Sequence, residues 1–453
     1  MKNLLQSAAD RATRYLEGLN DRRVAPTSRA IEGLARLDVP LPEQPSDPGD
    51  VLAALDEVGS PATLASAGGR FFGFVIGGAV PASLAANWLA GAWDQNAGMV
   101  TGSPVASRIE EIALGWLLEL LALPRDAAGA FVTGGTMANF TAICAARHAL
   151  LARVGWDVEA DGLFGAPPVT VIVSEEAHVS VLKSLGLAGF GRERVTRVPT
   201  DGQGRMRPDR LPPFDGPTLV CLQAGNVDTG AFDPAEEVCE RARAAGAWVH
   251  VDGAFGLWAA AAPERAGLVA GYERADSWAT DAHKWLNVPY DSGIAICRDA
   301  DSLRASMAVR AAYLVHGDRR EPCQTTPELS RRARGIEVWA AIRSLGRAGV
   351  ADLIERTCRH AARFAQGLRA AGHEVANDVV LNQVLVSFGD DEATRRVTAA
   401  VQADGTCWCG GTVWKGRTLM RISVSSWATT KDDVERSLEA ILRCAAGPRE
   451  PAA

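Results

Sequence analysis

From about residue 100 onward, short apolar runs alternate with alanine-rich stretches of helical spacing. The apolar runs are "AFV" before Thr133, "VTVIVSE" from Val169, "TLVCLQA" from Thr218, "AWVHVDG" from Ala247, "SWAT" from Ser277 and "GIAIC" from Gly293. Continuous apolar strands that alternate with helices are typical of a mostly parallel sheet covered on both faces. Ligands of such sheets bind beyond the carboxyl ends of the strands, so the residues after each run are candidates for function.

The pattern differs at the two ends of the chain. Charges are spaced along the first 19 residues as in a helix, and a proline-rich piece follows around residues 39–48. We interpret these as a helical arm and its connector. After Pro327 come two long helical patterns, two strands and a last helix, which predict a smaller α+β lobe. The expected parts are an arm with connector (residues 1–64), a large domain (65–310), and a lid segment with a small C-terminal domain (311–453).

Composition limits the kind of partner. Of the 453 residues, 47% are hydrophobic and 22% charged, which is ordinary for a globular enzyme. The net charge of −7 argues against a nucleic-acid partner, because such binding needs clustered Lys and Arg. The densest basic cluster is Arg331, Arg332 and Arg334, which we expect to be a solvated helix start.

The distribution of apolar residues and of cysteines disfavours a membrane protein and a disulfide-bonded or zinc-binding protein. No apolar run is long enough to span a bilayer, and the N-terminus lacks the apolar core of a signal peptide, so we expect no membrane partner. The nine cysteines include no CxxC pair, which favours free thiols in a reducing cytoplasm. Cys407 and Cys409 have no second pair to complete a zinc site, so we expect them to pack in a core and expect no metal.

A glycine-containing turn follows the first apolar run. It consists of Thr133, Gly134, Gly135 and Thr136, and a helical pattern begins at Met137. The glycines let backbone N–H groups approach an anion, Thr136 adds a hydroxyl, and the helix N-terminus adds partial positive charge. The turn is a candidate phosphate cradle, although taken alone it fits an N-capping turn better. Neither a Walker motif nor a strand-linked GxGxxG is present, which disfavours nucleotide triphosphates and dinucleotides.

Three other runs end in polar residues. His178 follows the second run, Asp252 ends the fourth, and His283 and Lys284 follow the fifth. Each alone has an ordinary structural explanation: a histidine with satisfied hydrogen bonds, a capping or paired carboxylate, or a lysine with a packed stem. Together with the turn they supply a phosphate cradle, a flat stacking group, an anion and an amine nucleophile. Those are the requirements of pyridoxal phosphate, which needs a phosphate anchor, ring contacts, a protonated ring nitrogen and a lysine.

With these motifs the chain resembles the group II pyridoxal-phosphate-dependent decarboxylases, the superfamily of aromatic-L-amino-acid and glutamate decarboxylases. The resemblance runs from about Phe71 to Ile441, and its motifs are "SPVASRIEEIALGWLLELLALP", "VTGGTMANFTAICAAR", "SEEAHVSVLKSLGLAG", "HVDGAFG" and "DAHKWLNVPYDSG". Their combination in this order is specific, although each motif by itself is not. The resemblance implies an α/β fold of type I, that of aspartate aminotransferase. It has a large domain with a mostly parallel seven-stranded sheet, a smaller α+β C-terminal domain and an N-terminal helical arm.

The resemblance also implies roles for individual residues. Lys284 would bind the cofactor as an aldimine, Asp252 would pair with the pyridinium nitrogen, and His178 would stack on the ring near the substrate carboxylate. The remaining cofactor contacts would be Gly134, Gly135, Thr136 and His283 at the phosphate, Ala254 beneath the ring and Asn226 near the phenolic oxygen. We expect nearby positive charge to favour the neutral, nucleophilic form of Lys284.

The implied activity is decarboxylation of an L-amino acid to its amine and carbon dioxide. The family works as homodimers with active sites at the subunit interface, so the arm would be a dimerisation element. Phe74, Val75 and Gly98 are candidates to line the substrate pocket. Aromatic decarboxylases tend to carry a bulky aromatic at the position of Gly98, which suggests a roomier pocket here. We expect an aromatic or bulky substrate, because an aromatic side chain could be accommodated by Phe71, Phe72, Phe74 and Trp93, although these could equally be core residues. Asp281 stands where many relatives have asparagine, and an acid there would repel a phosphate unless it points at backbone N–H groups.

The proton donor is the site's least determined part. In aromatic decarboxylases a mobile loop before the small domain carries a tyrosine that protonates the carbanion. The matching segment, residues 313–335, looks shortened and has no tyrosine after Tyr313. The donor would then be His316, His178, a water or a residue of the partner subunit, and histidine is suited to proton donation near neutrality. An aldehyde synthase, a transaminase or another lyase remain alternatives, and a non-catalytic binding protein is disfavoured because all four cofactor elements are intact.

Overall fold

The computed structural model describes residues 1–308 and 320–447, and the chain divides into two compact units. The large unit comprises residues 79–359 and 377–383, and the small unit comprises residues 1–78, 360–376 and 384–453. The N-terminal arm therefore belongs to the same unit as the C-terminal lobe. This division differs from the boundaries expected at residues 64 and 310, because a reading along the chain does not show which distant segments pack together.

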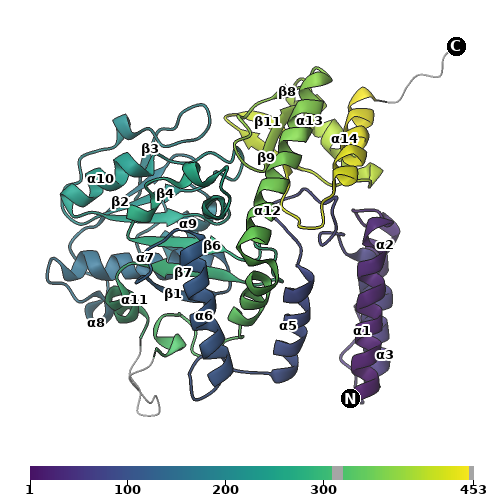
Figure 1. Ribbon diagram of the computed structural model, residues 1–453, viewed down its shortest axis with the longest axis horizontal. Coiled ribbons are helices and arrows are strands. Elements are labelled where there is room, and N and C mark those ends of the chain that lie inside the picture. The colour runs from purple at the N-terminus through teal and green to yellow at the C-terminus, as the bar shows by residue number, and fades with distance from the viewer. Residues whose placement is uncertain (309–319, 448–453) are drawn as a thin grey trace. The chain divides into compact units, whose positions relative to one another are not determined.

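Every strand predicted from an apolar run is present in the large unit, within one seven-stranded sheet (Figure 1). The strands are β1 (Ala128–Val132), β2 (Thr170–Ser174), β3 (Thr196–Val198), β4 (Thr218–Gln223), β5 (Trp248–Asp252), β6 (Ser277–Asp281) and β7 (Gly293–Cys297). Their order is β1-β7-β6-β5-β4-β2-β3. The apolar pattern missed β3, because two of its three side chains are exposed.

Strand direction places most strand ends at one edge of this sheet. Neighbours from β3 to β6 are parallel, while β7 is antiparallel to both β6 and β1. It follows that β1 runs in the same direction as β6. The carboxyl ends of all strands except β7 therefore lie at one edge, where β7 begins. The predicted mostly parallel sheet is confirmed, and the polar residues after β1, β2, β5 and β6 share that edge.

One face of the sheet is covered by α7 (Gly135–Ala152), α9 (Val179–Leu187) and α11 (Ala300–Met307). Alternate strand residues point toward these helices; they are Val171 and Val173, Leu219 and Cys221, and Trp248. Alanines along α7 are buried, which lets this helix lie close to the strands. A shift of one residue in any strand would turn its apolar positions to the other face, so this packing fixes the register.

The large unit also contains further helices. They are α5 (Pro81–Trp93), α6 (Pro104–Leu120), α8 (Val158–Asp161) and α10 (Ala235–Ala245). Short 3₁₀ turns occupy Pro208–Arg210, Gly256–Ala261, Ala266–Val269, Tyr272–Arg274 and Pro322–Gln324. The long helix α12 (Gly335–Ala370) starts in this unit, and Gly346, at φ +63°, interrupts its regular backbone.

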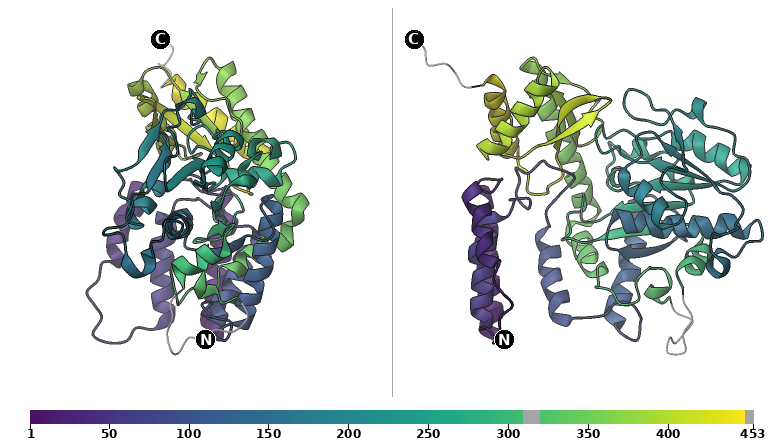
Figure 2. Two further views of the ribbon diagram at one scale, coloured as in Figure 1. Left: turned by 90° about the vertical axis from the view of Figure 1, so that its left-hand side faces the viewer. Right: turned by 180° about the vertical axis from the view of Figure 1, so that it is seen from behind.

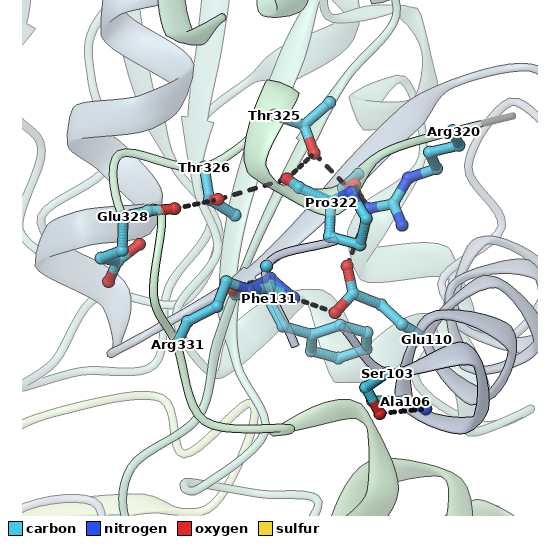
Figure 3. Close-up of polar contacts among 12 residues, drawn as sticks. Ser103, Ala106, Glu110, Phe131, Arg320, Pro322, Thr325, Thr326, Glu328 and Arg331 are labelled. Carbon is cyan, nitrogen blue, oxygen red and sulfur yellow. Dashed lines mark hydrogen bonds and ion pairs between the residues drawn. The ribbon is translucent and has the colours of Figure 1, made fainter. Parts of the chain in front are cut away.

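The basic segment before α12 is not the solvated helix start that we expected for residues 331–334. It precedes the helix, and Arg331 and Arg334 are only 6% and 7% exposed. Arg331 pairs with the buried carboxylate of Glu110 on α6, and Arg320 donates to Glu110 Oε1 at 2.8 Å (Figure 3). A carboxylate from a distant helix thus neutralises guanidinium groups that the basic run alone suggested were solvated.

The small unit combines the arm with the C-terminal lobe. Its helices are α1 (Lys2–Glu17), α2 (Ser28–Gly33), α3 (Pro48–Ala54), α4 (Ser60–Ala62), α13 (Asp391–Asp404) and α14 (Lys431–Ala446). Helices α1 and α3 lie side by side (Figure 1; Figure 2). The four-stranded sheet has the order β10-β11-β9-β8, with strands β8 (Glu374–Val375), β9 (Gln383–Ser387), β10 (Gly410–Trp414) and β11 (Arg417–Ser423). The two predicted strands are β9 and β11.

The structure bears on the expectations that the cysteines are free thiols and that no segment spans a membrane. All nine cysteines are free, and Cys407 and Cys409 are fully buried, as expected for packing residues. Within residues 1–308 and 320–447, no helix is both long enough and apolar enough to cross a membrane.

Candidate active site

The glycine turn and the lysine segment meet across strand β7. Gly293, the first residue of β7, pairs with Val132 at the end of β1 and with Asp281 at the end of β6. The turn after β1 passes directly over Gly293, where a side chain would place its Cβ 2.5 Å from Gly134. Glycine at position 293 is therefore required for this close approach, which brings the start of α7 over the end of β6.

The turn has the backbone expected of an anion cradle. Gly134 has φ +154°, a conformation that residues with side chains rarely adopt. Gly134 is also the N-cap residue of α7, so it offers no side chain to cap the helix. The first N–H groups of the helix have no intrahelical partner and carry the positive end of its dipole. Thr136 is half-buried in this first turn, and its carbonyl accepts from Ser184 Oγ at 2.8 Å. These features favour the cradle over the N-capping alternative.

Lys284 forms an ion pair with a carboxylate. Its Nζ lies 2.9 Å from Asp281 Oδ2, and the side chains of Lys284 and Asp281 are 23% and 2% exposed. The expectation that positive charge surrounds Lys284 is wrong, because the closest charged group is negative. A paired ammonium must lose its proton before the amine can act as a nucleophile. Asp281 is therefore part of the surroundings that control Lys284.

His283 has a defined neutral form. Its Nδ1 accepts from the backbone N–H of Ser292 at 3.0 Å, so the proton of the neutral ring is on Nε2. Burial lowers the pKa of His283, and this effect exceeds the opposing influence of Asp281. Nε2 lies 3.7 Å from Asp281 Oδ1, too far for a hydrogen bond. His283 thus presents an N–H donor at the end of β6 without adding a positive charge near neutrality.

Asp252 is oriented by donors from three elements. It ends β5 and is 3% exposed. Its Oδ2 accepts from Asn139 Nδ2 on α7 at 3.2 Å and from Ser180 Oγ on α9 at 3.4 Å. Its Oδ1 accepts from the backbone N–H of Ala254 at 3.2 Å. The carboxylate is therefore held in one orientation at the edge of the sheet.

Behind Asp252 lies a buried chain of hydrogen bonds that sequence reasoning missed. Asn139 Oδ1 is 2.9 Å from His250 Nε2, His250 Nδ1 is 3.0 Å from Ser277 Oγ, and Ser277 Oγ accepts from Trp248 Nε1 at 2.9 Å. Because the amide of Asn139 donates to Asp252, its oxygen must accept, and His250 therefore carries its proton on Nε2. Burial lowers the pKa of His250 to about 4, so the ring is neutral at pH 7.

One signal in the sequence could have revealed half of this network. His250 precedes Asp252 by two residues, so both side chains project from the same face of the strand. A histidine in the middle of a continuous apolar strand requires hydrogen-bond partners. The sequence pattern cannot identify Asn139 as that partner, because the contact depends on how α7 lies across the sheet.

His178 is fixed as the N-cap residue of α9. Its Nδ1 accepts from the backbone N–H of Ser180 at 3.2 Å and is 2.7 Å from Ser180 Oγ. The same hydroxyl contacts Asp252, so one serine links the two predicted site residues. The cap sets the orientation of the half-buried imidazole. His316, the other candidate proton donor, lies outside the described residues.

Asn226 is engaged in the turn that follows β4. Its Oδ1 accepts from the backbone N–H groups of Asp228 at 2.9 Å and Thr229 at 3.1 Å. Its Nδ2 donates to Gln223 Oε1 at 3.3 Å. The buried side chain thus holds the turn, and its role beside the cofactor's phenolic oxygen stays a prediction.

The three candidate substrate residues have different surroundings. Phe74 and Val75 belong to the small unit and Gly98 to the large one. Phe74 is 59% exposed and stacks on Trp408 with ring centroids 5.9 Å apart, whereas Val75 is 5% exposed. At Gly98 a Cβ would lie 2.0 Å from the carbonyl oxygen of Leu329. Close backbone packing is thus sufficient reason for this glycine.

A helix N-terminus, an amine and an oriented carboxylate at one sheet edge define a site for a phosphorylated cofactor that reacts with amines. The chain belongs to the pyridoxal-dependent decarboxylase family, whose conserved-domain model matches residues 33–389. It is 31% identical over 384 residues to L-2,4-diaminobutyrate decarboxylase of Rhizobium meliloti (strain 1021), covering 80% of this chain and 75% of that protein. It is 28% identical over 375 residues to aromatic-L-amino-acid decarboxylase of Bacillus atrophaeus, covering 78% of this chain and 74% of the relative.

A solved structure supports the same family. The crystal structure of Oryza sativa TDC with PLP and tryptamine superposes with a TM-score of 0.91 and 25% identity, over 98% of this chain and 97% of that chain. The protein is a pyridoxal-phosphate-dependent amino-acid decarboxylase. The predicted family, fold and cofactor are confirmed.

The residues at the sheet edge fit this cofactor. The N-cap residue of α7 is Gly134, so no side-chain oxygen of this residue competes with an anion for the first N–H groups of the helix. Lys284 would supply the amine, and Asp252 would supply an acceptor for a protonated ring nitrogen. Asp281 fits a bound phosphate less simply, because its Oδ1 is buried and finds no hydrogen-bond partner in the part of the chain that the structure describes.

Proposed function

We propose that the protein decarboxylates an L-amino acid with an aromatic or otherwise bulky side chain and releases the amine and carbon dioxide. The observation that carries the substrate class is the conformation of Phe74. Its φ of +52° is rare for a residue with a bulky side chain, and the exposed ring stacks on Trp408. Backbone strain of this kind concentrates at functional positions, and an exposed stacked aromatic is suited to contact an aromatic substrate.

A diamino acid is the second candidate substrate. It is favoured by the relative from Rhizobium meliloti, which acts on 2,4-diaminobutyrate and is 31% identical. The relative from Bacillus atrophaeus acts on aromatic amino acids and is nearly as similar, at 28%. We give priority to the aromatic class because the Phe74 arrangement supports it independently.

The proposed chemistry assigns a role to each residue at the sheet edge. When bound, pyridoxal phosphate supplies an aldehyde that condenses with amines and a ring that accepts the electron pair of the broken Cα–carboxylate bond. The N–H groups at the start of α7, the Thr136 hydroxyl and His283 Nε2–H would hold the phosphate. The Asp252 carboxylate, which Asn139, Ser180 and Ala254 hold in one orientation, would pair with the protonated ring nitrogen.

The remaining steps are proton movements. Lys284 must give up its proton before its amine can react, and the carboxylate of Asp281 is its ion-pair partner at 2.9 Å. After carbon dioxide departs, a proton must be added to Cα in place of the carboxylate. His178 is our first candidate for that donor, since its ring is fixed by the α9 cap, and His316 is the second.

We also propose that the protein is a cytoplasmic homodimer with active sites at the subunit interface. The arm supports this, because α1 contains no buried residue in the single chain. Of the 23 large hydrophobic side chains that are exposed among the described residues, 11 lie within residues 1–64. An exposed apolar surface of this density is typical of a protein–protein contact.

The experiment is a substrate panel with the cofactor-loaded protein in air. The panel contains L-tryptophan, L-tyrosine, L-glutamate and L-2,4-diaminobutyrate, and carbon dioxide, amine, aldehyde and peroxide are measured. We expect amine from an aromatic substrate and a higher KM for it in Phe74→Ala, with no change in Phe164→Ala, whose ring is 98% exposed in the large unit. Preferred turnover of diaminobutyrate would overturn the substrate class. Aldehyde with peroxide as the main products would establish an aldehyde synthase instead.

The lysine assignment has its own test. Lys284→Ala should retain non-covalent binding of pyridoxal phosphate and lose both turnover and the shifted visible absorption of the lysine-bound cofactor. Lys183→Ala, on the exposed side of α9, is the matched control and should behave as the parent protein. An unaltered visible spectrum in Lys284→Ala would mean that another lysine binds the cofactor.

A further inference from the structure

A buried carboxylate lies within the proposed phosphate site. Asp281 ends β6, and its side chain is 2% exposed. A Cβ built on Gly135 would lie 2.8 Å from Asp281 Oδ2 and 3.5 Å from Oδ1. The carboxylate therefore lies against the first residue of α7, an 18-residue helix whose N-cap residue is a glycine.

The groups around Asp281 are those that a phosphate would use. The positive end of α7, the Nε2–H of His283 at 3.7 Å and the ammonium of Lys284 at 2.9 Å surround it. Oδ2 pairs with Lys284, whereas Oδ1 is buried and has no hydrogen-bond partner among residues 1–308 and 320–447. An unsatisfied buried acceptor is costly, so packing alone does not account for a carboxylate here.

The backbone of Asp281 is fixed on both sides. Its N–H donates to the carbonyl of Ala254 at 2.9 Å, and its carbonyl accepts from Trp258 Nε1 at 3.1 Å. The strand end cannot shift away without breaking these bonds. These bonds hold the backbone of Asp281 beside the start of α7 when a phosphate binds there, and a carboxylate and a phosphate close together in a buried site repel strongly.

A simpler role for Asp281 is that of counter-ion to Lys284 alone. That role uses one carboxylate oxygen and leaves the position beside Gly135 and the unpartnered Oδ1 without explanation. It also predicts that removing the charge would alter the amine chemistry of Lys284 and leave phosphate recognition unchanged. The two roles are therefore separable by a ligand that has a phosphate and no aldehyde.

We propose that Asp281 is a resident anion of the phosphate site, where it competes with the cofactor's phosphate for the helix N-terminus, His283 and Lys284. Asp281 thereby sets the affinity for the phosphorylated cofactor below the value that the cradle would otherwise give. The inference rests on the proposed assignment of the phosphate to the start of α7. It concerns selectivity for the phosphate group, which is distinct from the reaction itself.

The test compares pyridoxine 5′-phosphate with pyridoxine, which differ only in the phosphate and carry an alcohol that cannot condense with Lys284. Dissociation constants are measured by calorimetry for the parent protein, Asp281→Asn and Asp281→Ser. The matched control is Asp276→Asn, which removes a charge next to the opposite end of β6, where Asp276 accepts from Val249 N–H at 2.8 Å. Two substitutions at position 281 keep the test usable if one variant folds poorly.

We expect Asp281→Asn and Asp281→Ser to bind pyridoxine 5′-phosphate at least about 10-fold more tightly, because these substitutions remove the Coulomb repulsion between the carboxylate and the phosphate. Pyridoxine affinity and the control should change by less than about 2-fold, within the usual scatter of charge removal at a distance. An unchanged ratio between the two ligands, or weaker binding of the phosphorylated one, would refute the inference. If the parent protein binds pyridoxine 5′-phosphate no more tightly than pyridoxine, and Thr136→Val leaves both affinities unchanged, the proposed phosphate site fails instead.

Discussion

The Nε2 atom of His250 lies 2.9 Å from Oδ1 of Asn139, and this contact decides which way the Asn139 amide faces. With its oxygen bound to His250, Asn139 directs its NH₂ group at Asp252. All these groups are buried, so water cannot compete for the bonds. His250 is therefore a positioning residue for Asp252, acting through Asn139.

Replacing His250 should reduce turnover by releasing the Asn139 amide. We expect His250→Leu to lower kcat at least about 10-fold, the effect of losing one or two buried hydrogen bonds to a charged group. His250→Gln, which keeps an N–H donor, should recover part of that loss. The control is Cys221→Ala on β4, which alters the packing beside His250 on the neighbouring strand β5. Nitrogen NMR of labelled parent protein should show His250 protonated on Nε2 from pH 6 to 8, and the opposite tautomer would contradict the network.

The low pKa of His250 in the folded protein makes the free energy of unfolding decrease as the pH falls. The folded-state value of about 4 is below the ordinary value of 6.5, so between these values the unfolded chain binds more protons. The stabilisation is complete above pH 6.5 and is lost as the pH falls toward 4, by about 3 kcal/mol in total. Denaturant unfolding of the apoprotein at pH 7 and pH 5 measures this loss. His250→Gln should lose less stability than the parent protein over that interval, and equal losses would contradict the assignment.

Thr136→Val should weaken binding of pyridoxal phosphate by about 1–3 kcal/mol, because a charged oxygen loses its hydroxyl donor. Thr141→Val is the matched control on the same helix, where the hydroxyl bonds to the carbonyl of Met137 at 2.7 Å. Cofactor affinity is measured by equilibrium titration of each apoprotein. Equal affinity in Thr136→Val and the parent protein would mean that this turn only starts a helix.

Glu110→Gln should destabilise the large unit by about 3–5 kcal/mol, since it leaves Arg331 buried without its charge partner. Its neighbour Glu111 pairs with Arg108 at the surface of the same helix. Glu111→Gln should therefore change stability by at most about 1 kcal/mol. Denaturant unfolding of both variants provides the comparison, and similar small losses would show that Glu110 is not an essential counter-ion.

The sequence by itself determined six of the seven strands of the large sheet and the order of its functional groups. Buried parallel strands require continuous apolar runs, and glycine, histidine, aspartate and lysine at their ends stand out against such runs. The location of Gly134, Asp252 and Lys284 at one edge followed from the parallel direction of β1, β5 and β6. Local pattern was sufficient there because each strand is recognised by its own residues.

Only the tertiary structure decided which charges and polar groups meet. The sequence indicated that Arg331 is solvated, whereas the structure pairs it with Glu110, which is 221 positions away in the chain. Lys284 was expected among positive groups, yet the direction of the Asp281 side chain gives it a negative partner. Asn139 and His250 lie on different elements, and their contact depends on how α7 crosses β5. Electrostatic and hydrogen-bond partners are set by distance in space, which local periodicity does not encode.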